Sequence, residues 1–254
     1  MAMVDNWGSI SFLILYLGII WTLLLIIIIK NIKNRSFKQR DSVWKWTFLA
    51  YFLLAFGDNF HLGFRIYIFF GNLDFNSELT KFLFGTGYVA TGITMTYFYV
   101  AFFHVWAKLY GKKYSTPKKV KNYFIIVYIA FIIRVILIFL PYNHWFDYEP
   151  ALDFGFDFRI ITSIPLYVIG LLTVGLMYKS SKAEAQNPSG INPDWNKSNY
   201  SASIWFVFSF ICYTITLVTV VYIPLTGLLM IPKTVAYLIA LYYHYKYILN
   251  KEII

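Results

Sequence analysis

The sequence contains little charge and hardly any cysteine. Asp, Glu, Lys and Arg together make up only 13% of the 254 residues, whereas about a quarter is usual in soluble proteins. A soluble domain of this length would need more charge to cover its surface, so the composition excludes an ordinary soluble fold. The single cysteine, Cys212, excludes both a disulfide framework and a cysteine-rich metal site.

Motifs of several common protein classes are also missing. The chain has no nucleotide-binding loop and no helix-turn-helix, and Gly85 and Gly87 lie in an apolar segment with no strand before it, which indicates helix packing. The first apolar run, residues 9–29, follows no basic stretch and is too long for the hydrophobic region of a signal peptide. We therefore expect this run to be a membrane span.

Long apolar segments dominate the rest of the sequence. Hydrophobic residues account for 59% of the chain, and a helix needs roughly 20 apolar residues to cross a bilayer. Seven segments qualify and predict an all-α polytopic membrane protein, a seven-transmembrane-helix bundle forming one domain over residues 1–254. Because only a turn at Pro224 and Gly227 separates the last two segments, six spans with a re-entrant segment is the alternative. The predicted spans are residues 9–29, 46–70, 82–107, 122–141, 159–178, 202–222 and 226–247.

The loops between these segments alternate in charge. The first, third and fifth loops and the C-terminus are basic, and the second and fourth loops are acidic. The positive-inside rule then predicts an N-terminus outside and a C-terminus in the cytoplasm. We attribute the net charge of +10 to this pattern and expect no nucleic-acid partner. The acidic residues are Asp74 and Glu78 in the second loop and Asp147, Glu149, Asp153 and Asp157 in the fourth.

Two further expectations concern the chain as a whole. Frequent Lys, Ile, Asn, Phe and Tyr are typical of a prokaryote with an AT-rich genome, so we expect a multi-pass protein of the plasma membrane, in contact with its lipids. The stretch SSKAEAQNPSGINPDWNKS, residues 180–198, is rich in turn-forming residues and predicts a flexible linker.

The second span carries the densest set of ionisable residues. Asp58, His61 and Arg65 follow one another at i, i+3 and i+7, which places them within about 60° on one helix face. A charged group in hydrocarbon costs roughly 2.5–3.5 kcal/mol on insertion scales. This face is therefore predicted to point into the bundle or into a wet cavity.

The seventh span carries a second polar stripe. Lys233, Tyr237, Ala240 and His244 share one helical face, and Pro232 removes a backbone N–H beside the lysine. Since the second span runs outward and the seventh runs inward, Arg65 and Lys233 both fall in the outer third of the membrane.

Other spans add polar residues at the same depth. Arg134 lies in the outer half of the fourth span, and Thr91 and Thr94 lie in the third. Together the spans predict a polar, net-basic pocket that opens toward the outside.

The predicted roles divide this pocket in two. Asp58 and His61 are the candidate acid/base pair, because proton transfer needs two titratable groups close together. The candidate ligand-binding residues are Arg65, Lys233, Arg134, Tyr237, Thr91 and Thr94, with the cations suited to a phosphate or carboxylate.

Structural roles are open for the same residues. Asp58 can form an ion pair with Lys233, Arg65 or Arg134, and the imidazole of His61 can be hydrogen-bonded in the core. The two arginines can extend to the outer headgroups, and the threonines can bond across helices. A metal site at Asp58, His61 and His244 is disfavoured because His244 lies near the cytoplasmic end, so we expect no metal.

These residues favour a membrane-embedded enzyme that acts on a lipid or another amphipathic anion. A small transporter or receptor for an anionic ligand is the alternative, although no internal repeat supports transport. A structural partner subunit is the third hypothesis. The residues identify no cofactor and no protein partner.

Short stretches are similar to known seven-helix families. A lysine in the last span resembles the microbial rhodopsins, which would imply retinal on Lys233, but the third span has no acid to serve as counter-ion. The alkaline ceramidase group pairs histidines in its last helix, where His244 here stands alone. The Gly57–Asp58 step is similar to one in the lysoplasmalogenases. Each likeness covers too few residues to transfer site residues.

Overall fold

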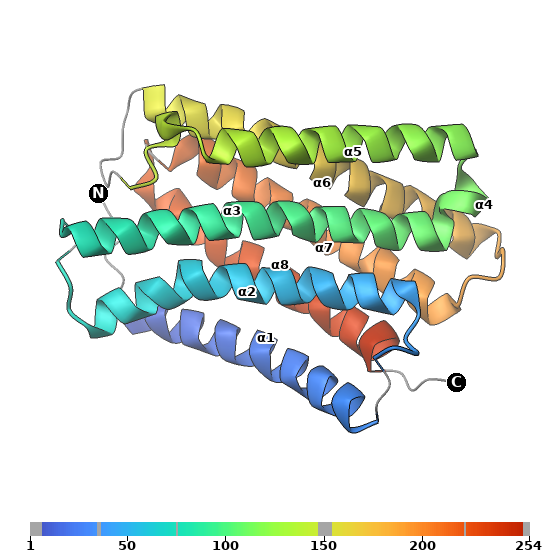
Figure 1. Cartoon of the computed structure of the whole chain (residues 1–254). Coiled ribbons are helices and arrows are strands. Elements are labelled where there is room, and N and C mark those ends of the chain that lie inside the picture. The colour runs from blue at the N-terminus through green and yellow to red at the C-terminus, as the bar shows by residue number, and fades with distance from the viewer. Residues whose placement is uncertain (1–6, 35–36, 75, 147–153, 221, 251–254) are drawn as a thin grey trace.

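The structure is a computed structural model that describes residues 7–34, 37–74, 76–146, 154–220 and 222–250, without the side chains of 154–157 and 224. Helices account for nearly all of these ranges, and the described residues include no β-strand. The α-helices of Figure 1 are α1 (Trp7–Lys33), α2 (Ser42–Phe70), α3 (Glu78–Trp106), α4 (Lys112–Tyr114), α5 (Pro117–Ile138), α6 (Phe154–Gln186), α7 (Pro193–Thr219) and α8 (Met230–His244). Tighter or wider turns extend them: η1 (Ala107–Gly111), η2 (Pro141–Asn143), η3 (Pro224–Leu229) and η4 (Tyr245–Leu249).

Helices occupy every one of the seven predicted segments. Within the described part of the chain, 6 helical stretches are long and apolar enough to cross a membrane. The remaining long helix, α2, has 29 residues, but Asp58, Asn59 and His61 lower its mean hydropathy. The molecule is thus an all-helical bundle with six candidate membrane helices, and the crossing by α2 stays a prediction.

Short polar side chains start several of these helices. Asp41 accepts a hydrogen bond from the backbone N–H of Trp44 at the start of α2, and Ser77 does the same for Thr80 at the start of α3. Thr116 caps α5. Such caps satisfy N–H groups that have no partner inside the helix.

Glycines allow α2 and α3 to pack closely. A Cβ atom on Gly57 would lie 1.9 Å from the Oγ1 atom of Thr94, and one on Gly87 would lie 3.0 Å from the Cα atom of His61. Small residues at helix crossings bring backbones together in this way. This contact fixes the part of α2 that carries Asp58 and His61 against α3.

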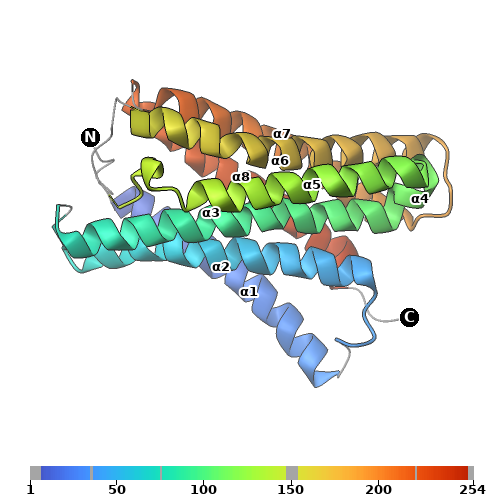
Figure 2. The same ribbon diagram turned by 45° about the horizontal axis from the view of Figure 1, so that its top comes forward.

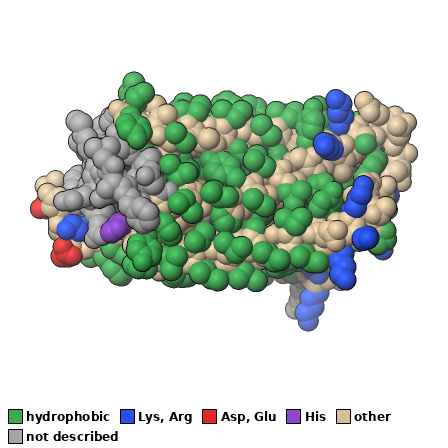
Figure 3. All heavy atoms as spheres, turned by 90° about the horizontal axis from the view of Figure 1, so that it is seen from above, with side chains coloured by type: hydrophobic (Ala, Val, Ile, Leu, Met, Phe, Trp, Pro, Cys, Tyr) green, Lys and Arg blue, Asp and Glu red, His purple; other side chains and the backbone are tan. Residues whose placement is uncertain are grey.

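The two ends of the bundle differ in charge. One end carries the N-terminal end of α1 and the connections α2–α3, α5–α6 and α7–α8, while the C-terminal side of α8 lies at the other (Figures 1 and 2). Figure 3 shows acidic side chains with a basic one among them at the first end, lysines and arginines at the second and an apolar belt between them. We call these the acidic end and the basic end. Of the acidic residues expected in the fourth loop, Asp147, Glu149 and Asp153 lie outside the described residues, as does the side chain of Asp157.

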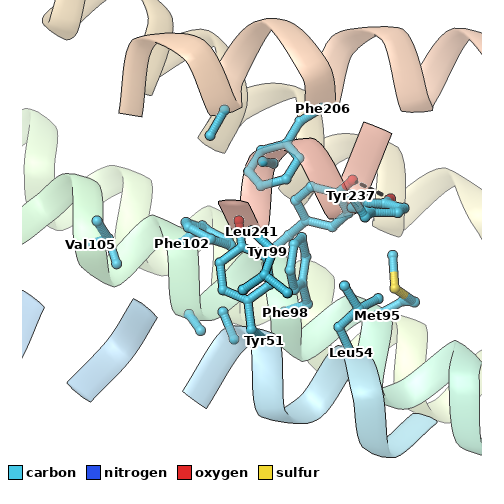
Figure 4. Close-up of a cluster of buried hydrophobic side chains, with 14 of the residues drawn as sticks. Tyr51, Leu54, Met95, Phe98, Tyr99, Phe102, Val105, Phe206, Tyr237 and Leu241 are labelled. Carbon is cyan, nitrogen blue, oxygen red and sulfur yellow. Dashed lines mark hydrogen bonds between the residues drawn. The ribbon is translucent and has the colours of Figure 1, made fainter. Parts of the chain in front are cut away.

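Aromatic side chains fill the centre of the bundle (Figure 4). The ring of Phe98 is fully buried and meets its neighbours edge to face, an arrangement that suits the quadrupoles of aromatic rings. The centroid distances from Phe98 are 5.8 Å to Tyr51, 5.0 Å to Tyr99, 4.9 Å to Phe102, 5.4 Å to Phe206 and 5.6 Å to Tyr237. We call these six residues the aromatic core.

The linker predicted over residues 180–198 is wrong. Helix α6 continues to Gln186 and α7 begins at Pro193. Glu184, only 3% exposed, holds the turn between them. Its carboxylate accepts hydrogen bonds from the backbone N–H groups of Ser189 and Ile191 and from the hydroxyls of Ser189 and Tyr114. The turn-forming composition did not reveal this buried acceptor.

Candidate functional site

A cavity of about 670 Å³ lies in the half of the bundle toward the acidic end. Its volume falls within the roughly 300–1,000 Å³ that is common for ligand pockets. Helices α1, α2, α3, α5, α6, α7 and α8 all contribute to its wall, and Tyr99 and Tyr237 of the aromatic core lie at its inner limit. The predicted site residues that line it are Asp58, His61, Arg65, Thr91, Arg134, Lys233 and Tyr237.

The two threonines of α3 are placed differently. Thr91 lines the cavity, and its hydroxyl also donates to the carbonyl of Gly57 at 3.0 Å. Thr94 is absent from the cavity wall; its hydroxyl donates to the carbonyl of Ala90 at 3.0 Å, and its Oγ1 atom lies against Gly57. The contacts of Thr94 therefore belong to the packing of α2 on α3.

Asp58 has a partner that the sequence did not indicate. Its Oδ2 atom accepts a hydrogen bond from the Tyr16 hydroxyl of α1 at 2.5 Å, and the residue is 9% exposed. None of the described Lys or Arg nitrogens lies within 4.0 Å of this carboxylate. The ion pair considered for Asp58 is thus not formed here. The only sequence signal for Tyr16 is a hydroxyl within an otherwise apolar run.

His61 lies one turn beyond Asp58 on the cavity wall. Its Nδ1 atom is buried and has no hydrogen-bond partner among the described residues. The imidazole ring lies 5.0 Å from the ring of Tyr88, centroid to centroid. His61 is therefore not a fully hydrogen-bonded core imidazole, and one ring nitrogen remains available for a proton or a ligand.

Arg134 is buried deep in the cavity wall, with 4% of its surface exposed. One guanidinium N–H donates to the carbonyl of Thr162 on α6, while Nε has no partner among the described residues. No described carboxylate lies within 4.0 Å of it. Arg134 thus does not extend to the headgroups, and its charge lacks a paired acid among the described side chains.

Lys233 is half-buried and reaches the cavity from the start of α8. Its ammonium lies 4.6 Å from the centre of the Tyr213 ring, a cation–π geometry. The Tyr213 hydroxyl in turn lies 3.2 Å from that of Ser163. Lys233 makes no salt bridge within the described chain. Helical periodicity alone could not identify Tyr213 and Ser163 as site residues, because neither residue type is unusual in its helix.

The rim of the cavity at the acidic end holds Arg159. Its guanidinium donates to the backbone carbonyls of Asn143 and His144, each at 2.7 Å, and lies 5.0 Å from the centre of the Trp145 ring. Trp145 also lines the cavity. These contacts hold residues 143–145 at the part of the cavity nearest the acidic end.

His244 is not brought to Asp58 and His61. Its Nδ1 atom lies 2.7 Å from the hydroxyl of Tyr51, and its ring packs against Phe102. It does not line the cavity. Among the described residues, no group of three or more His, Cys, Asp or Glu side chains has a geometry that could hold a metal ion.

The cavity therefore has two chemically distinct sides. The acid/base side consists of Asp58, Tyr16 and His61, and the anion side consists of Arg134, Lys233, Tyr213 and Ser163. Proton transfer needs the first set, and recognition of a carboxylate or phosphate needs the second. Arg65 lines the same cavity.

Comparisons with protein-family models, curated proteins and solved structures find no match to the chain. The roles of these residues therefore rest on their chemistry and geometry alone.

Proposed function

We propose that this protein spans the plasma membrane seven times, with its N-terminus outside and its C-terminus in the cytoplasm. We further propose that the cavity at its outer, acidic end binds an amphipathic anion and performs acid/base chemistry on it. The apolar belt between a basic and an acidic end supports the topology. The crossing by α2 is supported by its length and by its place beside α3 in the bundle.

Arg134 is the observation that carries the anion proposal. Burying a guanidinium without a counter-charge is costly, and breaking a buried ion pair costs about 3–5 kcal/mol for this reason. A carboxylate or phosphate in the cavity would supply the missing charge and a partner for Nε. Lys233 of the anion side adds a second cation, and the hydroxyls of Tyr213 and Ser163 add polar contacts.

Apolar side chains in the same wall indicate that the anion carries a hydrocarbon part. They come from helices on several sides of the cavity and leave apolar surface beside its polar groups. These residues include Leu13, Leu62, Leu166, Leu217 and Ile231. A lipid, or a fatty acid, combines an anionic head with such a chain.

The acid/base side suggests chemistry beyond binding. In this proposal, the unpartnered Nδ1 atom of His61 exchanges a proton with the substrate, and the Tyr16 hydroxyl keeps the Asp58 carboxylate in place beside it. A receptor would need the anion side alone. Asp58→Asn and His61→Ala should therefore remove turnover of the substrate while leaving its binding within about threefold, since neither removes a cation.

Binding of simple anionic lipids tests the proposal directly. The purified full chain in phosphatidylcholine nanodiscs is titrated with oleate and, separately, with phosphatidic acid. Arg134→Gln and Lys233→Met should each weaken binding of one or both by about tenfold, the value of a charge-assisted hydrogen bond. Lys118→Met, an exposed lysine near the start of α5 at the basic end, is the matched control and should change nothing. Unchanged affinity in both cavity variants would overturn the proposal.

Transport is less well supported than an enzyme. A transporter needs a second opening toward the basic end, and the aromatic core fills the bundle between the cavity and that end. Uptake of oleate into vesicles that follows a proton gradient and stops with Asp58→Asn would favour transport instead.

A further inference from the structure

A second hollow lies on the outer surface of the bundle, between α6 and α7. This groove has a volume of about 280 Å³. Its side chains are mostly apolar and face outward: Leu171 and Ile211 are each 52% exposed. We call it the seam groove, and its lining residues are Tyr167, Leu171, Val207, Phe210, Ile211, Thr214 and Ile215.

Phe210 separates the seam groove from the cavity. It lines both spaces, and its ring packs 4.9 Å from the ring of Tyr99 and 5.6 Å from that of Tyr167. The ring rests on Gly170, where an added Cβ atom would lie 2.1 Å from its Cζ atom. A single layer of aromatic side chains thus divides a lipid-facing hollow from a polar one.

The cation of Lys233 lies directly behind this layer. Tyr213, three residues after Phe210 on α7, stacks on Tyr167 with ring centroids 5.9 Å apart. The ammonium of Lys233 also lies against Tyr213, 4.6 Å from the centre of its ring. Across the α6–α7 seam, the apolar groove is therefore followed by the aromatic layer and then by the cationic cavity.

We propose that the seam groove holds the acyl chain of an anionic lipid whose headgroup lies on the anion side of the cavity. The lipid enters sideways from the bilayer between α6 and α7, and the ring of Phe210 turns aside to let it pass. This inference rests on the proposed function and names the substrate class as a membrane lipid. The position of Phe210 in the walls of both spaces and the charge behind the layer favour this occupant over a neutral lipid.

A sideways route also suits the energetics of an acyl chain. A chain that stays in the groove keeps its apolar surface away from water, and each CH₂ group kept dry adds to the stabilisation. Entry through the rim at Trp145 and Arg159 would expose that chain to water. Because Gly170 has no side chain, the Phe210 ring can pack against it when the seam is closed.

Photolabelling tests both the groove and its dependence on the headgroup. The full chain in phosphatidylcholine nanodiscs receives a phosphatidic acid with a diazirine on its acyl chain, or the matching phosphatidylcholine. Mass spectrometry of the labelled peptides then locates the chain. We expect the phosphatidic acid to label the groove residues of α6 and α7 severalfold more than the phosphatidylcholine does, and Arg134→Gln with Lys233→Met to remove this excess.

A pair of substitutions on α6 identifies the route without disturbing the core. Leu171→Trp fills the groove from the lipid side, and Ile164→Trp lies one heptad earlier on the same helix face, 53% exposed and outside both hollows. Leu171→Trp should remove most of the excess labelling and slow binding of the phosphatidic acid severalfold. Ile164→Trp should leave both unchanged.

The possible failures are distinguishable. If the excess labelling by phosphatidic acid falls on the cavity wall and not on the groove, or if the two tryptophan variants behave alike, the sideways route is wrong and the proposed function stands. If neither hollow prefers the phosphatidic acid and the affinities for oleate and phosphatidic acid are unchanged in the cavity variants, the anion site itself is wrong.

Discussion

Each half of the bundle has a histidine with a buried ring nitrogen, and the two histidines differ in what surrounds them. In the half toward the acidic end, His61 lies on the wall of the cavity of about 670 Å³, and its Nδ1 atom has no partner among the described residues. In the half toward the basic end, His244 is fully buried and packs against the aromatic core outside the cavity. Its Nδ1 atom bonds Tyr51, and its Nε2 atom has no partner among the described residues. The residue type alone therefore does not indicate a site; the space beside it does.

The buried arginines of the two halves show the same contrast. Arg40, at the basic end, donates from Nε to the side chain of Asn31 at 2.7 Å and lies over the Trp44 ring. Arg134, in the cavity wall, leaves Nε without a partner among the described residues. In the acidic-end half the unpartnered polar atoms belong to residues that line the cavity, whereas in the basic-end half His244 Nε2, which also lacks a partner among the described residues, belongs to a residue outside it. This difference supports our proposal that the acidic-end half carries the candidate site.

Substitution in the aromatic core should have the largest effect on stability. Phe98→Ala removes a fully buried ring with five aromatic neighbours among the described residues, so we expect a loss of about 3–5 kcal/mol. Phe12→Ala on the cavity wall should cost less than half of that, because the ring is only half-buried there. Denaturant unfolding in mixed micelles measures both, and equal losses would remove the distinction between the halves.

Substitution at the α2–α3 contact should have the next largest effect on stability. Gly57→Ala places a Cβ atom against Thr94, and overpacking of this kind costs about 1–3 kcal/mol. Thr94→Ala removes the Oγ1 atom that would lie 1.9 Å from this Cβ, so the double variant should recover most of the loss. A double-mutant cycle of unfolding free energies measures the coupling, and simple additivity would show that the two residues do not meet.

The two histidines give the sharpest test of the comparison. His244→Ala leaves the buried hydroxyl of Tyr51 without its partner and should cost about 1–3 kcal/mol of stability. The Nδ1 atom of His61 makes no hydrogen bond within the described chain. His61→Ala should therefore leave the stability within about 0.5 kcal/mol of wild type while removing turnover. A large stability loss for His61→Ala would make it a structural residue like His244.

The smallest effect is expected at the α6–α7 turn. Ser189→Ala removes one of the hydrogen bonds to Glu184 and should cost about 0.5–1.5 kcal/mol. Hydrogen exchange of the backbone amides of Ser189 and Ile191 should rise at the same time. An unchanged exchange rate would show that the hydroxyl does not hold this turn.

The sequence predicted the helices well because hydrophobic length and helical periodicity are local properties. The same periodicity placed Asp58, His61 and Arg65 on one face and Lys233 with Tyr237 on another, and the structure brings all five to one cavity. The count of seven spans, the orientation and the function remain predictions.

The partners of those residues could not be predicted. The hydroxyl of Tyr16, the ring of Tyr213 and the carbonyl of Thr162 come from other helices, and contacts between helices depend on their rotation and depth in the bundle. The position of Thr94 depended in the same way on how closely α2 approaches α3. The turn after α6 was predicted as a flexible linker because its composition does not reveal the buried acceptor at Glu184.

Native mass spectrometry of the intact chain tests the central claim most directly. The protein is released from nanodiscs that contain equal amounts of phosphatidic acid and phosphatidylcholine, and the retained lipid is identified by mass. We predict that the wild-type chain retains phosphatidic acid in preference to phosphatidylcholine and that Arg134→Gln with Lys233→Met abolishes the preference. Equal retention of both lipids by the wild-type chain, or the same preference in the double variant, would contradict an anion site in the acidic-end half.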